Sequence, residues 1–457
     1  MPNSLVKSAR VAIPLDLVTK GGLSDWVAGL DDTGRTWAKA AGFKAGKGEA
    51  LLLPSAEGAP AAAALGVGGL DDFWAVGSGS TALPEGAYRI RTALDAEQAT
   101  NAAIAWALGA YAFDRYSDKR GGRARLVWPK GCDQTRAEAV IEGVHFGRDL
   151  INTPASDMGP EELAAAAQAL AKRHKAKFKA TVGDNLLKDN FPTIHAVGRA
   201  SVRAPRLIDM TWGKAGSPKV TLIGKGVCFD TGGLDLKPAA GMLNMKKDMG
   251  GAANVLAVAA MIMGAGLDVR LRVLIPAVEN SVAGNAMRPL DVIRTRKGIT
   301  VEVGNTDAEG RLGLCDGIAL AMEEKPELVV DCATLTGAAR VALGPSLPAL
   351  FANDDALADD LLAAGLAVDD PVWRLPLHQP YRRMLDSDVA DINNVSPGGF
   401  GGAITAALYL HAFAEDTAPW AHIDMMGWNT AAAPGRPKGG EAQSARAIFE
   451  MLRRRYG

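Results

Sequence analysis

Hydrophobic and polar residues alternate with two different periods from about residue 155 onward. Short apolar runs typical of buried strands are followed by longer stretches in which apolar positions recur at helical spacing. The predicted elements are strand 220–223, helix 253–263, strand 270–276, helix 312–322, strand 328–330 and a last strand at 421–426. This order predicts an α/β fold with a mostly parallel central sheet flanked by helices, whose ligands bind beyond the carboxyl ends of the strands.

The N-terminal part of the chain shows a different pattern. Short apolar runs at 50–53 and 88–90 alternate with Gly- and Pro-rich turns, and one long helix is predicted at 95–116. Apolar residues at helical spacing within 135–150 predict a helix that carries the chain onward. The predicted divisions are a smaller N-terminal α/β domain (1–133), a linking helix (134–152) and a larger domain that holds the candidate site (153–457).

Composition suits a globular protein with two domains. The chain has 457 residues, of which 48% are hydrophobic and 22% are charged, which is the balance of a protein with a sizeable core. Its formal net charge of -1 gives no overall attraction to nucleic acid or to an acidic membrane surface.

The cysteines and the N-terminal residues indicate the cellular compartment. Residues 1–20 lack the apolar core of a secretory signal, and the longest apolar stretches, 102–113 and 254–267, fall short of the ~20 residues that span a bilayer. The four cysteines form no CxxC pair, so neither a zinc knuckle nor a disulfide framework is indicated. They are Cys132, Cys228, Cys315 and Cys332. We therefore expect a cytoplasmic protein without a membrane segment.

A glycine-rich segment places two charged residues at the end of a predicted strand. Gly224-Lys-Gly-Val-Cys-Phe-Asp-Thr-Gly-Gly leaves that strand and contains Lys225 and Asp230. A phosphate-binding loop is the alternative explanation of these glycines. The Walker A motif requires Gly, four residues and then Gly-Lys-Ser/Thr, whereas here residue 219 is lysine and a glycine follows Lys225; GxGxxG also fails, at Phe229.

Two further charged residues, Lys237 and Asp248, lie in the Pro- and Gly-containing loop before the helix predicted at 253–263. An aspartate just before a helix is most often its N-cap. Asp248 by itself therefore leaves both a capping role and a role in a site open.

The segment Asn305-Thr-Asp-Ala-Glu-Gly-Arg-Leu is the most informative. In an extended stretch, Asp307 and Glu309 would present their carboxylates to the same side. Two carboxylates so close together are unfavourable unless they share a cation. A solvated turn could tolerate them, but this segment lies between apolar strand and helix segments, which favours metal binding.

Together these segments offer four carboxylates, enough to balance two divalent cations, and they contain none of the six histidines. The four are Asp230, Asp248, Asp307 and Glu309. Oxygen ligands suit magnesium or manganese more than a single structural zinc, so ligand type does not fix the metal. In two-metal hydrolases the ions lie ~3.5–4 Å apart and share a water that becomes nucleophilic at neutral pH.

Lys237 and Arg311 complete the candidate site. A protonated Lys237 could stabilise the oxyanion of a tetrahedral intermediate. Arg311 stands at the start of the helix predicted at 312–322, where unpaired backbone N–H groups also favour an anion that could act as a base. A salt bridge from Arg311 to one of the acids is the alternative.

At these residues the sequence resembles the leucyl aminopeptidase family, the dinuclear cytosol aminopeptidases. The family's motif Asn-Thr-Asp-Ala-Glu-Gly-Arg-Leu is intact at 305–312. Its Gly-Lys-Gly, Phe-Asp-Ser/Thr-Gly-Gly, Lys-Pro and Asp-Met-Gly-Gly-Ala-Ala elements lie at 224–226, 229–233, 237–238 and 248–253. The resemblance is strongest from about residue 140 to the C-terminus, and it is specific because several unrelated loops match at once.

The resemblance implies an aminopeptidase that removes N-terminal residues from peptides by a metal-bridged hydroxide. Its cofactors would be two divalent ions, Mn²⁺ or Zn²⁺, and bicarbonate. Arg311 would hold the bicarbonate as general base, and Lys237 would polarise the scissile carbonyl. One ion would be held by Asp230, Asp307 and Glu309, and the other by Lys225, Asp230, Asp248 and Glu309. Lys225 would then be an unprotonated amine, because a neighbouring dication lowers its pKa.

The resemblance also implies a substrate pocket with Met245, Thr334 and Gly337. Met426 and Asn429 fall where other members carry smaller or more apolar residues, so the far wall of that pocket differs. The family is generally a homohexamer.

Two other functions remain open from the sequence. Cleavage of cysteinyl-glycine would use the same residues, and only the shape of the pocket separates it from general peptide trimming. DNA binding is the other, since some bacterial relatives do both. Its support is thin, because the basic runs at 119–125, 172–179 and 453–455 are of a kind that more often forms a solvated face.

Overall fold

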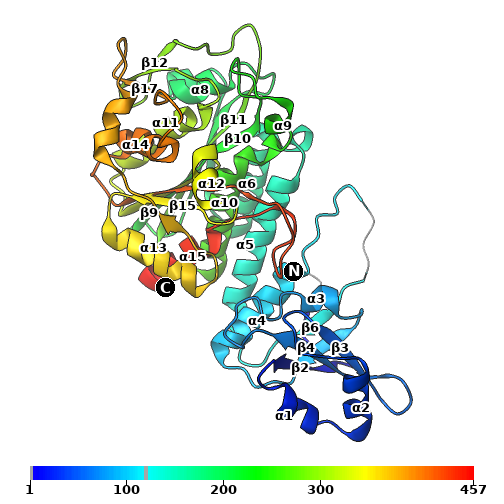
Figure 1. Ribbon diagram of the computed structural model, residues 1–457. Helices are drawn as coiled ribbons and strands as arrows, with labels where there is room; N and C mark the ends of the chain where they lie inside the picture. Colours follow the sequence, from blue (N-terminus) through cyan, green and yellow to red (C-terminus); the bar gives the residue numbers. More distant parts are fainter. Residues whose placement is uncertain (1–3, 118–121) are drawn as a thin grey trace. The chain divides into compact units, whose positions relative to one another are not determined.

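The computed structural model describes residues 4–117 and 122–457, so part of the basic run at 119–125 lies outside the described residues. The chain divides into two compact units. The smaller comprises Met1–His145 with Ala431–Lys438, and the larger comprises Phe146–Thr430 with Gly439–Gly457. Figure 1 labels many of the helices and strands of both.

The smaller unit contains a six-stranded sheet. Its order is β1-β6-β5-β2-β4-β3, and all neighbours are parallel except β3 and β4. The strands are β1 (Leu5–Val6), β2 (Ile13–Thr19), β3 (Ala50–Pro54), β4 (Pro60–Val67), β5 (Ala87–Ile90) and β6 (Arg125–Val127). The helices are α1 (Leu23–Ala28), α2 (Asp32–Ala40), α3 (Gly79–Ala82) and α4 (Ala96–Gly109).

Helix α4 is shorter than the helix predicted at 95–116. It begins after Asp95, whose side chain accepts a hydrogen bond from the backbone of Gln98 while Gln98 bonds back, a capping box. It ends at Gly109, where a Cβ atom would meet the carbonyl oxygen of Gly77 at 1.8 Å. The packing of this helix end against another loop therefore sets its length, and an apolar pattern does not report such packing.

A segment from late in the chain, Ala431–Lys438, belongs to the smaller unit. The guanidinium of Arg436 lies 4.9 Å from the ring centroid of Trp74, a cation–π contact. Gly435 has a φ of +70°, and a Cβ there would lie 2.0 Å from the same ring. The range 153–457 predicted for the larger domain thus includes one segment that packs elsewhere.

The larger unit contains a nine-stranded sheet in the order β16-β15-β18-β14-β9-β11-β8-β7, with β10 also paired to β11. The strands β18, β14, β9 and β11 are parallel neighbours, and β10 is parallel to β11. The bounds are β7 (Lys177–Val182), β8 (Arg206–Trp212), β9 (Lys219–Gly224), β10 (Gly226–Asp230), β11 (Arg270–Asn280), β14 (Leu328–Ala333), β15 (Ala349–Ala352), β16 (Trp373–Arg374) and β18 (Trp420–Asp424). The predicted fold class, a mostly parallel sheet flanked by helices, is confirmed.

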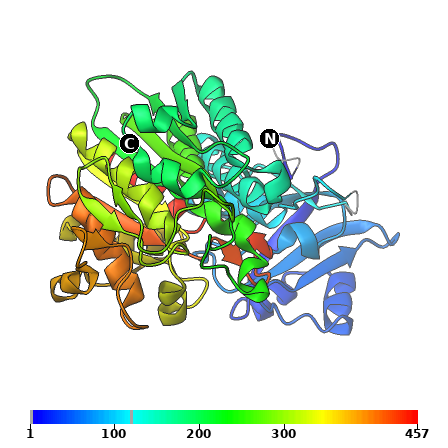
Figure 2. The same cartoon turned by 90° about the horizontal axis from the view of Figure 1, so that it is seen from above.

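Two groups of helices cover this sheet. Helices α10, α13 and α15 pack together, as do α8, α11 and α14, while α10 and α11 both contact β9. The sheet therefore lies between the two groups (Figures 1 and 2). The α-helices of this part of the chain are α5 (Gln134–Asn152), α6 (Pro160–His174), α7 (Asn185–Lys188), α8 (Pro192–Gly198), α9 (Ala239–Met242), α10 (Gly250–Ala265), α11 (Glu309–Glu323), α12 (Gly337–Leu343), α13 (Asp355–Ala367), α14 (Gly402–Ala414) and α15 (Ala445–Tyr456).

Short elements complete the larger unit. Three 3-10 helices are η1 (Ala155–Asp157), η2 (Met245–Met249) and η3 (Gln379–Leu385). Two small sheets pair β12 (Val292–Arg294), β13 (Thr300–Glu302) and β17 (Ile392–Asn393), and β19 (Trp428–Asn429) with β20 (Gly439–Gly440).

One helical run among the described residues, Met245–Ala265, is long and apolar enough to cross a membrane. It is longer than the apolar stretch predicted at 254–267 because η2 continues directly into α10. Inside the protein, 89% of its apolar window is buried, so its apolar residues serve the core, where a helix that is hydrophobic on all sides belongs.

Candidate metal centre

The carboxyl ends of parallel strands place the first charged residues of the site. Strand β9 ends at Gly224 and is followed by Lys225, while β10 ends at Asp230. Asp230 lies opposite Asn280 of β11, whose Nδ2 donates a hydrogen bond of 2.9 Å to Asp230 Oδ1. Lys225 and Asp230 are only 3% and 2% exposed. Their charges are therefore buried and need partners of opposite charge or hydrogen bonds.

Asp248 lies in η2, directly before α10. It does not cap that helix, whose N-cap is Met249 with no side-chain hydrogen bond. Its carboxylate instead accepts a hydrogen bond of 2.9 Å from Thr334 Oγ1 and lies 2.7 Å from Lys225 Nζ. The capping interpretation is therefore wrong, and Asp248 is part of the candidate site.

Asp307 and Glu309 lie where a turn meets a helix. The predicted extended alternation is wrong here, because Asp307 is in the turn and Glu309 is the first residue of α11. The turn is held by the buried Asn394, whose Oδ1 accepts from the N–H of Gly304 at 2.8 Å. Its Nδ2 donates to the carbonyl of Asn305 at 2.8 Å. The turn, and not strand geometry, brings the two carboxylates to the same side.

The start of α11 packs tightly against Lys225. A Cβ atom at Gly310 would lie 2.8 Å from Lys225 Nζ, so a side chain there would displace the ammonium group from its present place. Lys225 Nζ lies 2.9 Å from Glu309 Oε1 and donates to the carbonyl of Thr334 at 3.1 Å. Gly310 of the motif at 305–312 thus lets Lys225 come close to the start of α11.

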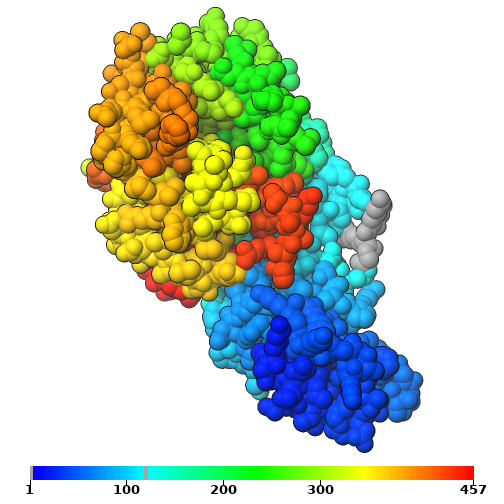
Figure 3. Space-filling view, in the orientation of Figure 1, coloured from blue at the N-terminus to red at the C-terminus, as the bar shows by residue number. Residues whose placement is uncertain are grey.

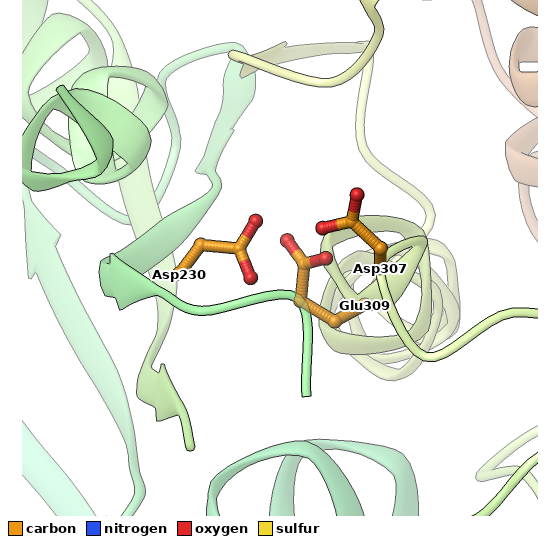
Figure 4. Close-up of side chains that lie close together, drawn as sticks. All are labelled: Asp230, Asp307 and Glu309. Atoms are coloured by element: carbon orange, nitrogen blue, oxygen red, sulfur yellow. The ribbon is translucent and has the colours of Figure 1, made fainter. Parts of the chain in front are cut away.

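Three carboxylates from different elements converge (Figure 4). Asp230 of β10, Asp307 of the turn and Glu309 of α11 point toward one another. Each offers a ligand oxygen, and these oxygens lie within 4.8 Å of one another. Such a cluster of oxygens suits a hard divalent cation.

The electrostatics of the cluster also point to a cation. Burial, and then repulsion from Asp230, raise the pKa of Glu309 to about 8 and that of Asp307 to about 6. For Asp248, burial opposes the charge, but Lys225 and Lys247 outweigh it and lower the pKa. Acids whose mutual repulsion raises their pKa would be relieved by a divalent cation.

The donor atoms fit a metal as well. Among the described residues, three buried carboxylate oxygens at this site have no hydrogen-bond donor other than lysine, and they are Asp248 Oδ2, Asp307 Oδ1 and Glu309 Oε1. Each faces a lysine ammonium group. Each carboxylate oxygen has a second lone pair besides the one that faces the lysine, and a metal could use it as a ligand.

Each of two lysines bridges two acids. Lys225 lies between Asp248 and Glu309, and Lys237 lies between Asp230, at 2.9 Å, and Asp307. Burial disfavours the charge on both lysines, but attraction from the acids is greater and raises the pKa of each. Without a metal, both are therefore ammonium groups at neutral pH.

Arg311 is buried in the first turn of α11 without an acidic partner. Its Nη1 donates to the carbonyl of Asn394 at 2.6 Å, and its Nε has no acceptor. Within the described chain, no carboxylate lies within ion-pair distance of it, so the salt-bridge alternative is wrong. Burial lowers its pKa, which means that its charge lacks compensation and that a small anion would stabilise it.

The site opens into a pocket of about 290 Å³. Lys225, Asp230, Lys237, Asp248 and Asp307 line it, whereas Glu309 and Arg311 lie outside its lining. The predicted substrate residues Met245, Thr334 and Gly337 line the same pocket, as does Met426. Asn429 does not, and its Nδ2 donates to Glu441 at 2.8 Å.

Segments far apart in the chain build this pocket. Gly241 comes from α9 and Gly337 from α12, drawn in green and yellow on the face shown in Figure 3. A larger cavity of about 530 Å³ is lined by other residues, among them Asn353, Arg374 and His411, and by none of the predicted site residues. The smaller pocket is therefore the candidate active site.

Sequence reasoning missed several residues of the site. Asn280 orients Asp230, and Asn394 holds both the turn and Arg311. Single asparagines carry no local signal, because their role depends on strands that meet only in the folded chain. Lys247 and Arg340 also line the pocket. Their neighbours in the sequence do not distinguish them from ordinary surface cations.

The sequence matches models of known protein families over most of its length. The cytosol aminopeptidase family, catalytic domain, matches residues 145–449. The chain belongs to the cytosol aminopeptidase family. The M17 aminopeptidase N-terminal domain matches residues 13–129. The likeness to this family therefore extends into the smaller unit, beyond the range in which the sequence resemblance is strongest.

Relatives of this aminopeptidase cover nearly its whole length. The crystal structure of the cytosol aminopeptidase from Coxiella burnetii is 47% identical, with a TM-score of 0.96 over 99% of this chain and 100% of that one. A probable cytosol aminopeptidase of Leifsonia xyli subsp. xyli is 40% identical over 90% of this chain and 89% of the relative. The bottromycin maturation enzyme BotP in complex with Mn is 34% identical, with a TM-score of 0.87 over 97% of this chain and 99% of that one.

Membership of the family settles the reaction class. The protein is a metallopeptidase, a hydrolase that acts as an aminopeptidase. The predicted leucyl aminopeptidase resemblance is confirmed at the level of the family.

Proposed function

We propose that this aminopeptidase uses two divalent cations, manganese or zinc, to remove N-terminal residues from peptides. The convergence of Asp230, Asp307 and Glu309, with ligand oxygens within 4.8 Å of one another, carries the proposal. The solved complex of BotP with Mn supports manganese as one of the metals. When bound, the two ions would lower the pKa of a water and so supply a nucleophile at neutral pH.

The residues divide between the two cations. Asp230, Asp307 and Glu309 would hold one, and Asp248, Asp230, Glu309 and Lys225 would hold the other. Lys225 can ligate only as a neutral amine, although the surrounding acids raise its pKa in the metal-free chain. A dication beside it reverses the local electrostatics, so loading of that site would release the Lys225 proton.

Lys237 would act as the electrophile. Its side chain is 15% exposed and lines the pocket, so a bound peptide can reach its Nζ. Its pKa is raised by Asp230 and Asp307, which outweigh burial, and it stays protonated at neutral pH. A fixed ammonium group stabilises the negative charge that develops on the scissile carbonyl oxygen.

Arg311 would hold bicarbonate as the general base. A buried guanidinium with an unpaired Nε is suited to a small planar anion, because its N–H groups match two of the anion's oxygens. The first turn of α11 adds unpaired backbone N–H groups at the same place. The bound anion would take the proton of the attacking water.

The pocket would receive the N-terminal side chain of the substrate at Met245, Thr334 and Gly337. The free amino group of the peptide would lie among the acids, which explains removal of one residue at a time. We also propose a cytoplasmic location, in keeping with relatives named as cytosol aminopeptidases, and a homohexamer, which rests on the family resemblance.

No observation in the described structure favours DNA binding. The C-terminal basic run is neutralised by neighbouring acids, since Arg453 and Arg454 bond to Glu450 and Arg455 bonds to Asp360.

The test uses protein stripped of metal and reloaded with manganese or zinc. We expect cleavage of a panel of aminoacyl amides only after reloading, and loss of that cleavage in Asp307→Ala. Asp268→Ala is the matched control, because Asp268 is 69% exposed and lies outside the pocket. No cleavage with either metal, or an Asp307→Ala variant as active as wild type, would remove the proposal.

A further inference from the structure

The pocket wall carries a cation without an acidic partner. Arg340 of α12 lines the pocket together with Lys237 and Asp307. Its one polar contact is from Nη1 to the thioether sulfur of Met426, at 3.4 Å, and a thioether is a weak acceptor. No carboxylate of the described chain lies within ion-pair distance of Arg340.

Two other arginines of the larger unit, unlike Arg340, are paired with acids. Arg296 bonds to Glu323 through two hydrogen bonds of 2.7 and 2.9 Å, and Arg272 bonds to Asp209 in the same way, at 3.1 and 2.7 Å. A guanidinium has five N–H donors, so most of the donors of Arg340 have no protein acceptor. They are available to a ligand in the pocket.

The position of Arg340 is set by the strand beneath it. Helix α12 starts after Thr336, whose Oγ1 caps it by accepting from Ala339 N–H at 3.0 Å. Asp424, at the end of β18, accepts from the N–H groups of Leu335 and Thr336 and from the Thr336 hydroxyl, at 3.0, 3.1 and 2.6 Å. The first turn of α12 is therefore fixed to the central sheet.

From that turn the arginine reaches back over Gly337. Its Nη2 lies 3.7 Å from the point where a Cβ of Gly337 would be. The guanidinium thus lies between Gly337 and Met426, two residues of the pocket wall, and apart from the acids of the metal centre. A substrate side chain entering along this wall meets the guanidinium.

We propose that Arg340 is a specificity-determining residue that favours peptides whose N-terminal residue is aspartate or glutamate. A carboxylate can accept two parallel hydrogen bonds from a guanidinium, and the methylene groups of the substrate side chain would contact the apolar parts of Met245 and Met426. An N-terminal lysine or arginine would instead be repelled. This inference rests on the proposed function, because it requires the N-terminal side chain to occupy this pocket.

Glutamyl and glutaminyl amides test the inference, since they have nearly the same shape and differ in charge. With manganese-loaded protein, wild type is expected to have the higher kcat/KM for the glutamyl amide. Arg340→Gln should lower the glutamyl-to-glutaminyl ratio by about 10- to 100-fold, the range of a charge-assisted hydrogen bond. Arg340→Glu should reverse the preference toward lysyl amide. Arg288→Ala, an arginine with a 70% exposed side chain outside the pocket lining, should leave the ratio unchanged.

Direct binding gives a second measurement. Calorimetry should show that manganese-loaded wild type binds L-glutamate more tightly than L-glutamine, and that Arg340→Gln abolishes the difference. An unchanged ratio in Arg340→Gln, or an equal loss on both amides, would overturn the inference, as would an effect seen only with substrates that have a free C-terminal carboxylate. If no aminoacyl amide is cleaved after metal loading, the proposed function fails instead.

Discussion

Two groups of charged side chains lie in or beside the same sheet and differ in how they are partnered. Inside β14 and β18, Asp331 Oδ2 accepts from Trp420 Nε1 at 2.7 Å, and its Oδ1 contacts His422 Nδ1. At the carboxyl ends of the strands, by contrast, Asp230 of β10 faces Asp307 of the turn and Glu309 of α11. Asp331 has a donor or partner for each of its oxygens, whereas the other three carboxylates lie close enough to repel one another.

The difference separates a structural role from a functional one. In the strand interior, burial disfavours the charge on His422, but attraction from Asp331 is greater and raises its pKa, so the pair stabilises itself. At the strand ends, burial and repulsion raise the pKa of Glu309 to about 8. A buried cluster whose own members destabilise one another indicates a ligand that compensates them.

The sharpest test of the comparison is Glu309→Gln, which removes an acid from the strand-end group. We expect kcat/KM with manganese to fall by about 10⁴-fold or more, because the proposed function assigns Glu309 to both ions, and its loss would remove several kcal/mol of transition-state stabilisation.

The stability of the metal-free protein should change in the opposite direction to its activity when Glu309 is replaced by glutamine. The folded pKa of about 8 lies above the reference value of 4.5, so metal-free wild type loses stability as pH rises through that window, and Glu309→Gln lacks this loss. Urea unfolding in chelator at pH 5 and pH 8 measures it. A variant that is less stable than wild type at pH 8 would contradict the conclusion that burial and repulsion from Asp230 destabilise the charged form of Glu309.

The second prediction concerns the buried Asp331, which is paired with Trp420 and His422 inside the sheet. Asp331→Ala leaves His422 and the Trp420 N–H without their acceptor in a fully buried place, so we expect a loss of ~3–5 kcal/mol in the free energy of unfolding. Urea denaturation measures this. Asp355→Ala, whose side chain is 86% exposed, should change stability by no more than ~0.5 kcal/mol. An equal change in both variants would refute the structural role of Asp331.

The smallest of these effects is expected for Lys237→Ala. Because Lys237 Nζ would act on charge that develops in the transition state, kcat should fall by about 10²–10³-fold while KM changes little. Steady-state kinetics on one aminoacyl amide separates the two constants. The control is Lys214→Ala, whose side chain is 85% exposed. A proportional loss in kcat and gain in KM would show that Lys237 binds substrate in the ground state.

Local patterns predicted the central elements well and their ends less well. The strand predicted at 220–223 is β9, the helix predicted at 253–263 lies within α10, and the helix predicted at 312–322 lies within α11. Helix α11 starts earlier, at Glu309, because Asn394 holds the preceding turn in place. That contact spans more than eighty residues of sequence and has no local signal.

The charge pattern of the sequence by itself determined that acids and lysines gather after the central strands. This follows because strand ends in a parallel sheet meet at one edge, and because closely spaced acids without histidine indicate an oxygen-liganded cation. The family motifs then connected these loops with an aminopeptidase.

Only the tertiary structure decided which partners each charge has. It replaced the predicted cap at Asp248 with a contact to Lys225, left Arg311 without an acid, and tied Asn429 to Glu441 outside the pocket. It also placed Arg340 at the pocket wall. The reason is physical: hydrogen bonds and ion pairs act over a few ångströms, and the residues that come within that range are brought together by the packing of elements far apart in the chain.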